Sequence, residues 1–431
     1  KCIKTTMKYF IFIIIIFYLS TSVPAQGIHI ESIIHTADAD SKLLVNQRTT
    51  EFINQQNFSL PLIREAEIRL GINGNATPNQ LDGYLRNEDY YAIKISPNSL
   101  RERKYQRALK PAQADLYKSN DHMFMQEAIF ERYQSIVKLY YAEIFIKEKS
   151  KLQPFLVKKS ALLNEMLDQG LDIKFKDVVD VEYDKNDLLS SLFEYSNIVN
   201  EEHERIKGFL NVSDSIFVDF DHFISSDEIR TIILTVDTSN VVLSPEVIYT
   251  KYKAQLSMAE LNYQKSRNKQ IFSFFQAGYS PVVVSEEAKT KFNPSNDLTF
   301  RFGVNVPIGA NNNLRRSEAA IKLYEDKNDA ILTREKYKAD IMLQRTKILQ
   351  LIDAKDQWQK MFDNNLILKL LKNESLKDQI TPLEIMDMEI SVIKLKLQGL
   401  KLDDKIANEY IELMSIIGAL NDTAMNYLTR D

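Results

Sequence analysis

The chain has 431 residues, of which only 11 are glycine and 11 proline, while aromatic residues make up 10%. So few helix breakers over this length favour long helices. A formal net charge of −4 gives no basic excess for nucleic acid, and the single cysteine, Cys2, allows no internal disulfide or cysteine metal site. The five histidines form no metal-binding pair, and the phosphate-loop, dinucleotide and hydrolase motifs are absent. We therefore expect no metal, no cofactor and no catalytic residue, and the protein is not predicted to be an enzyme.

Residues 7–25 have the pattern of a secretory signal peptide. Met7-Lys8 precedes an almost wholly apolar run over 9–18, and Val23-Pro24-Ala25 supplies small residues where a signal peptidase reads. We expect cleavage after this alanine and export of the protein. The alternative is an uncleaved anchor, although the run is short for a membrane-spanning helix. No later segment reaches the ~20 apolar residues of such a helix, so β-strands would have to do any spanning.

The sequence repeats itself at an offset of 207 residues, the separation of Gly71 from Gly278. Segment 177–182 matches 384–389 at the same offset, and the strand pattern at Ile93 and Ile95 matches that at Phe300 and Phe302. Agreement of three separate regions indicates an old duplication, with about 200 residues in each half.

Each half is expected to contain a short upper helix, a β-hairpin and a long helical hairpin, in that order. The expected segments, in chain order, are an N-terminal segment with the first upper helix (26–60), the first hairpin (61–97), the first helical hairpin (98–210), a linker or equatorial segment (211–243), the second upper helix (244–268), the second hairpin (269–308), the second helical hairpin (309–420) and a C-terminal tail (421–431). The loops of the two hairpins, 75–88 and 281–296, are rich in polar residues and are expected to be exposed.

The hairpin strands alternate strictly between apolar and polar residues, which predicts one apolar and one polar face. In the clearest case, Phe300, Phe302 and Val304 alternate with Arg301 and Asn305. Strands of ~9–11 residues cross a bilayer when tilted, and an apolar face outward is typical of membrane strands. We predict that the apolar set contacts lipid and the polar set water. A soluble, half-buried hairpin would alternate in the same way; the signal peptide and the aromatic content favour the membrane.

Very long helical stretches follow each hairpin, over 98–168 and 311–371, and return along 176–210 and 380–419. Sixty to seventy residues span ~90–105 Å as a helix. Apolar residues recur at spacings of three and four, which indicates coiled-coil packing. Pro111 is expected to kink or break the first long helix, and so is Pro154.

Residues 245–331 carry a resemblance to a known family. A strand ends in Ala277-Gly278-Tyr279-Ser280, a second strand runs into Val306-Pro307-Ile308, and Ala319 lies early in the next helix. The order and spacing of these motifs, together with the duplication, resemble the TolC-like outer-membrane efflux proteins over nearly the whole mature chain. The sequence departs from the family at Gly309-Ala310-Asn311-Asn312-Asn313, where an aromatic residue and paired glycines are usual.

The resemblance implies a mixed but mainly α fold and a homotrimer. Each subunit would give four strands to a shared twelve-stranded membrane β-barrel, standing on a periplasmic α-helical barrel. It also implies a passive exit duct in the outer membrane, serving a tripartite efflux or type I secretion system. Its partners would be outer-membrane lipid, a periplasmic adaptor and an inner-membrane transporter. The alternative is a scaffold: a coiled-coil protein of the cell envelope that forms no pore.

Two sets of site residues follow from the resemblance. Glu384 and Asp387 match paired acids at the start of the family's last helix, where threefold symmetry would make them acidic rings at the channel entrance. Gly170-Leu171 resembles the helical tip where an adaptor docks. The simpler explanations are acids that favour a helix N-terminus and a glycine that ends a helix. Asp177 and Asp180 hold the equivalent place in the first repeat and are not expected at the gate.

Overall fold

We describe the protein from a computed structural model. It describes residues 26–56, 61–75, 86–171, 174–220, 223–267, 272–279, 298–304, 310–373, 380–421, 423–424 and 426–429. The expected signal peptide, Asn305, the second hairpin loop and most of the first loop lie outside the described residues.

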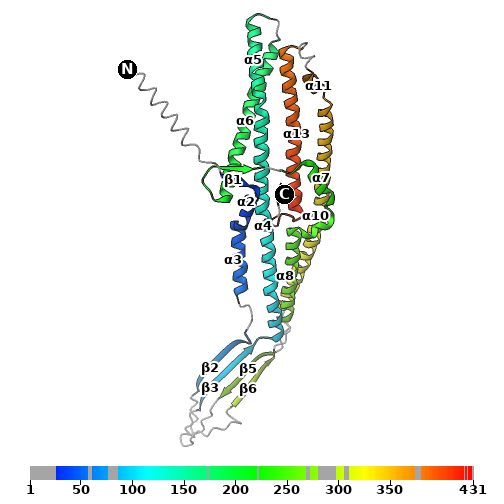
Figure 1. Cartoon of the computed structure of the whole chain (residues 1–431). Helices are drawn as coiled ribbons and strands as arrows, with labels where there is room; N and C mark the ends of the chain where they lie inside the picture. Colours follow the sequence, from blue (N-terminus) through cyan, green and yellow to red (C-terminus); the bar gives the residue numbers. More distant parts are fainter. Residues whose placement is uncertain are drawn as a thin grey trace, which may run out of the picture. The chain divides into compact units, whose positions relative to one another are not determined.

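Helices dominate the structure, and the order of a helix, two strands and long helices occurs twice (Figure 1). The elements in chain order are β1 (Gln26–His29), α2 (Ile30–His35), η1 (Thr36–Ala39), α3 (Ser41–Gln55), β2 (Ile63–Asn75), β3 (Arg86–Pro97), α4 (Leu100–Ser150), α5 (Leu152–Asp168), α6 (Phe175–Leu210), β4 (Ile216–Asp219), α7 (Ser226–Thr235), η2 (Thr238–Leu243), α8 (Pro245–Arg267), β5 (Phe272–Tyr279), β6 (Leu298–Val304), α10 (Ala310–Asp363), α11 (Leu366–Lys372) and α13 (Pro382–Ile416).

The chain forms two compact units. One is built from residues up to 44 together with 122–245 and 334–431, and the other from 45–121 and 246–333. Helices α4 and α10 each contribute residues to both units. Among the described helices, none combines the length and the apolar character needed to cross a membrane.

The unit formed by 45–121 and 246–333 contains an antiparallel sheet in the order β2-β3-β5-β6 (Figure 1). The register places Ile68, Ile93, Ala277 and Phe300 side by side, so the apolar positions of all four strands share one face. That face is exposed: Ile68 keeps 74% of its surface and Phe300 60%. On the opposite face Gln276 keeps only 3%. Strands β2 and β3, with 13 and 12 residues, are longer than expected, and β5 and β6, with 8 and 7, are shorter.

Each short helix of this unit is joined to the long helix that follows its hairpin. The Asn46 amide on α3 donates to the Tyr117 carbonyl on α4, at 2.9 Å. On α8, 207 residues later, Lys253 forms ion pairs with Asp326 and Asp329 of α10, at 3.3 and 3.2 Å. Equivalent positions thus join the short helix to the long helix in both repeats, by a hydrogen bond in the first and by ion pairs in the second, as expected after a duplication.

The other unit has a core between its helices. Tyr133 of α4, Ile206 of α6 and Tyr410 of α13 are fully buried there. Segment 211–243, expected as a polar linker, contributes helix α7, which begins with a capping box between Ser225 and Glu228. It also contributes β4, which pairs in parallel with β1.

The long helices are interrupted at two places. Helix α4 ends at Ser150, whose carbonyl would otherwise accept the amide hydrogen that Pro154 lacks. This confirms the break expected from Pro154, whereas α4 continues through Pro111. The expected continuous helix over 311–371 is wrong at its end, because the Asn365 side chain accepts from the amide of Ile367 at 2.8 Å and starts α11.

The start of that helix also differs from the expectation. The helical stretch was expected from residue 311, and α10 begins one residue earlier, at Ala310, within the segment where the sequence departs from the family. Three asparagines therefore lie within the first turn of the helix.

Helices α6 and α13 both end in a left-handed residue. Asn211 has φ 54° and Gly418 has φ 74°, and the two are 207 residues apart. At Gly418 a Cβ atom would lie 2.3 Å from the backbone oxygen of Leu243, so this end of α13 requires glycine.

Replacing Gly418 by alanine should lower the free energy of unfolding by about 2 kcal/mol or more, because it adds backbone strain and a clash with main-chain atoms. The matched control is Gly208→Ala in α6, where a Cβ would meet open space and where alanine should stabilise by about 0.5–1 kcal/mol. Urea unfolding of both variants, followed by circular dichroism, checks this. Equal effects of the two substitutions would show that the cap is not under this constraint.

Candidate functional site

The start of α13 is organised by a capping box. Thr381 is the N-cap, and its hydroxyl oxygen accepts from the amide of Glu384 at 3.3 Å. The Glu384 carboxylate accepts in return from the amide of Thr381 at 2.9 Å and from its hydroxyl at 2.7 Å. The hydroxyl hydrogen bond, followed by the amide hydrogen bond, holds the pKa of Glu384 below its ordinary value, although the side chain is exposed.

Asp387 lies three residues further along, on the same face of α13. Its carboxylate forms an ion pair with Lys159 of α5. Two turns later, Lys394 of α13 forms a second ion pair, at 2.8 Å, with Asp184 of α6. Helix α13 is thus joined to the first helical hairpin by two ion pairs. Exposed pairs of this kind contribute about 0–1 kcal/mol each.

The equivalent acids of the first repeat have a different local structure. Asp177 is in the first turn of α6, as Glu384 is in the first turn of α13. The N-cap of α6 is Lys174, which makes no side-chain capping hydrogen bond. Lys174 and Thr381 are 207 residues apart, so the repeat has kept the acids and changed the cap.

The turn after α5 shows why Gly170 is glycine. Its φ is 71°, and its amide donates to the carbonyl of Leu167, while the amide of Leu171 donates to that of Met166, both at 3.0 Å. This pair of hydrogen bonds is a Schellman motif, which needs a left-handed residue. Leu171, the other residue of the predicted docking tip, is half-exposed. The local geometry thus explains the glycine but not the exposed leucine.

The residues predicted to contact lipid lie together on the apolar face of the sheet. Phe300, Phe302 and Val304 keep 60%, 65% and 66% of their surface. The ring of Phe275 on β5 packs between the rings of Phe300 and Phe302, with centroid distances of 6.2 and 5.2 Å. The three aromatic rings form a continuous apolar surface that nothing in the described chain covers.

Sequence reasoning found the acids of α13 but not their partners. The capping box was readable, because a threonine three residues before a glutamate is its usual signature. Lys159, the partner of Asp387, carried no such signal, and neither did the pair of Lys394 with Asp184, since pairing between helices far apart in sequence depends on packing. Among the described residues, no group of three or more His, Cys, Asp or Glu side chains is arranged to hold a metal ion.

Comparison of sequences finds no relative: no protein-family model matches, and neither does any curated protein. Comparison of structures finds several. CusC is 13% identical, with 90% of this chain and 91% of that chain covered and a TM-score of 0.66. The MtrE outer-membrane channel of Neisseria gonorrhoeae, in its open state, is 13% identical over 90% and 88% of the two chains, with a TM-score of 0.62. The outer-membrane protein VceC of Vibrio cholerae is 9% identical over 90% and 96%, with a TM-score of 0.59.

The chain therefore has the fold of the TolC-like outer-membrane efflux channels, which confirms the fold inferred from the sequence resemblance. The similarity extends over about nine-tenths of each chain, so it covers both units. Identities of 9–13% show the fold, and the function has to be argued from this chain's own residues.

Thr381→Ala should weaken the start of α13 by about 1 kcal/mol, which corresponds to about fivefold faster hydrogen exchange in its first turn. Lys174→Ala, at the equivalent position of α6, should leave exchange there unchanged, because that side chain makes no capping bond. Amide hydrogen exchange, measured by mass spectrometry in the first turns of α6 and α13, compares the two effects directly. A similar effect at both ends would contradict the assigned cap.

The pH dependence of the same turn tests Glu384. Because the folded-state pKa is lowered, its stabilisation is complete above the ordinary value of 4.5 and disappears as the pH falls through the folded pKa. Glu384→Gln should therefore speed exchange in this turn at about pH 6, and the effect should shrink as the pH is lowered below the ordinary pKa of 4.5. An effect that persists unchanged at the lower pH would mean that the carboxylate charge is not what stabilises the turn.

Proposed function

We propose that the protein is a subunit of an outer-membrane channel of an efflux system, a passive and non-catalytic duct that extends into the periplasm. The exposed apolar face of the sheet carries this proposal, and the fold supports it. Hairpins 61–97 and 269–308 would lie in the membrane, and helical hairpins 98–210 and 309–420 in the periplasm.

The apolar face of the sheet is the exposed one, as expected for strands that contact lipid. In a water-soluble protein the apolar face of a sheet is covered and the polar face is wet. Here Ile68, Phe300 and Phe302 are exposed, whereas Lys94 is half-buried and Gln276 buried on the other face. Apolar residues outward and polar residues inward is the arrangement of membrane strands. This arrangement favours a membrane channel over a scaffold that forms no pore.

The edges of the sheet support an oligomer. β2 and β6 are its outer strands, and each pairs with a single neighbour among the described strands. Lipid offers no partner to free backbone groups, so such edges must meet other copies. We propose a homotrimer that closes twelve strands into one barrel. Exposed apolar residues on α10, among them Ile321, Ile331 and Leu332, offer a further surface for a neighbouring subunit.

The ends of the helical hairpins are proposed to face the rest of the machinery. A periplasmic adaptor would dock at Gly170-Leu171 and connect the duct to an inner-membrane transporter. Glu384 and Asp387 would form acidic rings at the entrance, where they attract cations and repel anions. The ion pair of Asp387 with Lys159 is compatible with a closed entrance, in which α13 is held against the first hairpin.

The lipid-facing role is tested on neighbouring residues of β6. Phe302→Arg should lower barrel stability by about 2–4 kcal/mol if the residue lies near the membrane midplane, whereas Arg301→Ser should have little effect. Heat dissociation of the oligomer on a gel, after extraction from outer membranes, measures both. A chain that extracts as a monomer, or that tolerates both changes equally, would favour the scaffold protein.

The gate is tested by neutralising its acids. The double variant Glu384→Gln and Asp387→Asn should keep the oligomer and lower cation selectivity in planar bilayers, because the rings lose their negative charge. Block by multivalent cations from the periplasmic side should weaken as well.

The matched control neutralises Asp177 and Asp180, which share the sequence context but not the capping box. Selectivity should be unchanged in that variant. If it changes as much as in the Glu384 and Asp387 variant, the gate has been assigned to the wrong repeat. If neither variant differs from the wild type, the acids only stabilise the helix starts.

A further inference from the structure

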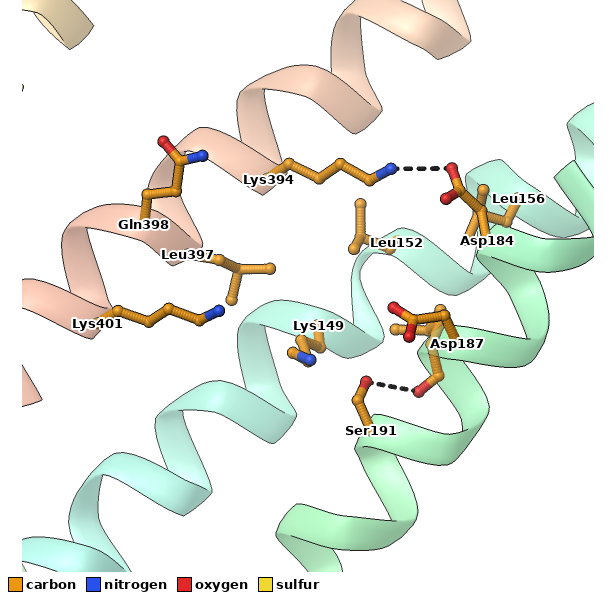
Figure 2. A pocket seen from close by; sticks show the side chains of 11 residues that line it. Lys149, Leu152, Leu156, Asp184, Asp187, Ser191, Lys394, Leu397, Gln398 and Lys401 are labelled. Atoms are coloured by element: carbon orange, nitrogen blue, oxygen red, sulfur yellow. Dashed lines mark hydrogen bonds and ion pairs between the residues drawn. The ribbon is translucent and has the colours of Figure 1, made fainter. Parts of the chain in front are cut away.

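A pocket of about 260 Å³ lies between α4, α5, α6 and α13, within the unit that contains these segments of the four helices (Figure 2). Its floor is apolar and consists of buried leucines from three helices: Leu152 and Leu156 of α5, Leu188 of α6 and Leu397 of α13. A dry cavity of about 150 Å³ is enough to take up benzene. The pocket therefore has room for one ring and a small polar head group.

Charged side chains surround this floor. Lys394 is neutralised by its ion pair with Asp184, as Figure 2 shows. Among the residues that the structure describes, Lys149 and Lys401 form no ion pair, although they line the same pocket from α4 and α13. Asp187 is the other acid of the lining. Two cations without an ion pair thus line the pocket, and Asp187 compensates the charge of Lys149 only in part.

The surroundings of Lys149 show that its charge is poorly compensated. Its pKa is lowered, first by burial and then by the positive charge of Lys401, while Asp187 and Glu194 act in the opposite direction. Its ammonium group also lies 5.1 Å from the centre of the Tyr195 ring. A negative charge placed between the two lysines would relieve their repulsion.

The acids of the lining restrict which anion fits. Asp187 repels a phosphate or another multiply charged ion more strongly than it repels a single negative charge, which can lie between Lys149 and Lys401. The leucine floor favours a flat apolar body over a water-covered ion. Together these features select an amphipathic monoanion about the size of an aromatic acid.

We propose that this pocket binds an aromatic monocarboxylate, with its carboxylate between Lys149 and Lys401 and its ring on the leucine floor. Such a ligand would join α4 to α13 and so hold the last helix against the first helical hairpin. This proposal does not depend on the proposed transport function.

The test uses the full chain in detergent and 4-fluorobenzoate as the probe, followed by ¹⁹F NMR. We expect saturable binding with a Kd of about 0.1–1 mM, the range for a ligand of this size. The uncharged 4-fluorobenzamide should bind at least about tenfold more weakly, because it lacks the charge that the lysines recognise. The benzamide also serves as the control for partition of a fluorinated aromatic compound into the detergent micelles.

Three variants locate the site. Lys149→Met and Lys401→Met should each weaken binding of 4-fluorobenzoate about tenfold. Lys396→Met, on the same helix as Lys401 but outside the pocket, should leave the affinity unchanged. Circular dichroism verifies that each variant folds, and Lys149→Met should fold well because it removes a poorly compensated charge. Equal affinity for the benzamide, unchanged affinity in both pocket variants, or no saturation at about 10 mM would overturn the proposal.

Discussion

One face of the sheet is apolar, and nothing in the described chain covers it. Its exposed side chains include Ile68, Leu70, Phe300 and Phe302. Each large apolar side chain left in water forgoes about 1.5–3 kcal/mol of burial. A single subunit cannot remove this cost of exposing apolar side chains, because nothing in the described chain packs on the apolar face of the sheet. The proposed membrane barrel would remove this cost, because lipid would cover the apolar face and copies of the sheet would pair with its edges.

The duplication gives the chain two similar helical hairpins, but the turns of these hairpins are chemically different. The first hairpin turns at Gly170 and re-enters a helix at Lys174 without a cap. The second re-enters at Thr381 with a complete capping box. The capping box holds the Glu384 carboxylate against the amide and the hydroxyl of Thr381, and α6 has no such contact. The two helical hairpins thus differ at their turns by a few residues.

Much of this fold was predictable because apolar periodicity records which face of an element is buried. Alternation around Phe300 predicted a strand, and spacings of three and four along α13 predicted a helix. Helix α7 was missed, because ten residues are too few to show a sustained period, although Ile229, Ile232 and Ile233 have helical spacing and the capping box at Ser225 marked its start. The break at Asn365 was missed for a different reason: its side-chain hydrogen bond competes with a helix that the local pattern otherwise favours. The charged pocket lay beyond prediction, since Lys149 and Lys401 are 252 residues apart in sequence.

Strand β1 near the start of the described chain pairs with β4, and Leu428 near its end is fully buried. The backbone amide of Tyr427 also donates to the hydroxyl of Tyr133, at 3.0 Å. One compact unit is therefore assembled from the beginning, the middle and the end of the chain. Such long-range contacts slow folding, because loop closure must precede the contacts that reward it. This unit lacks part of its core until Tyr427 and Leu428 are in place, and an incomplete core leaves apolar surface exposed to aggregation.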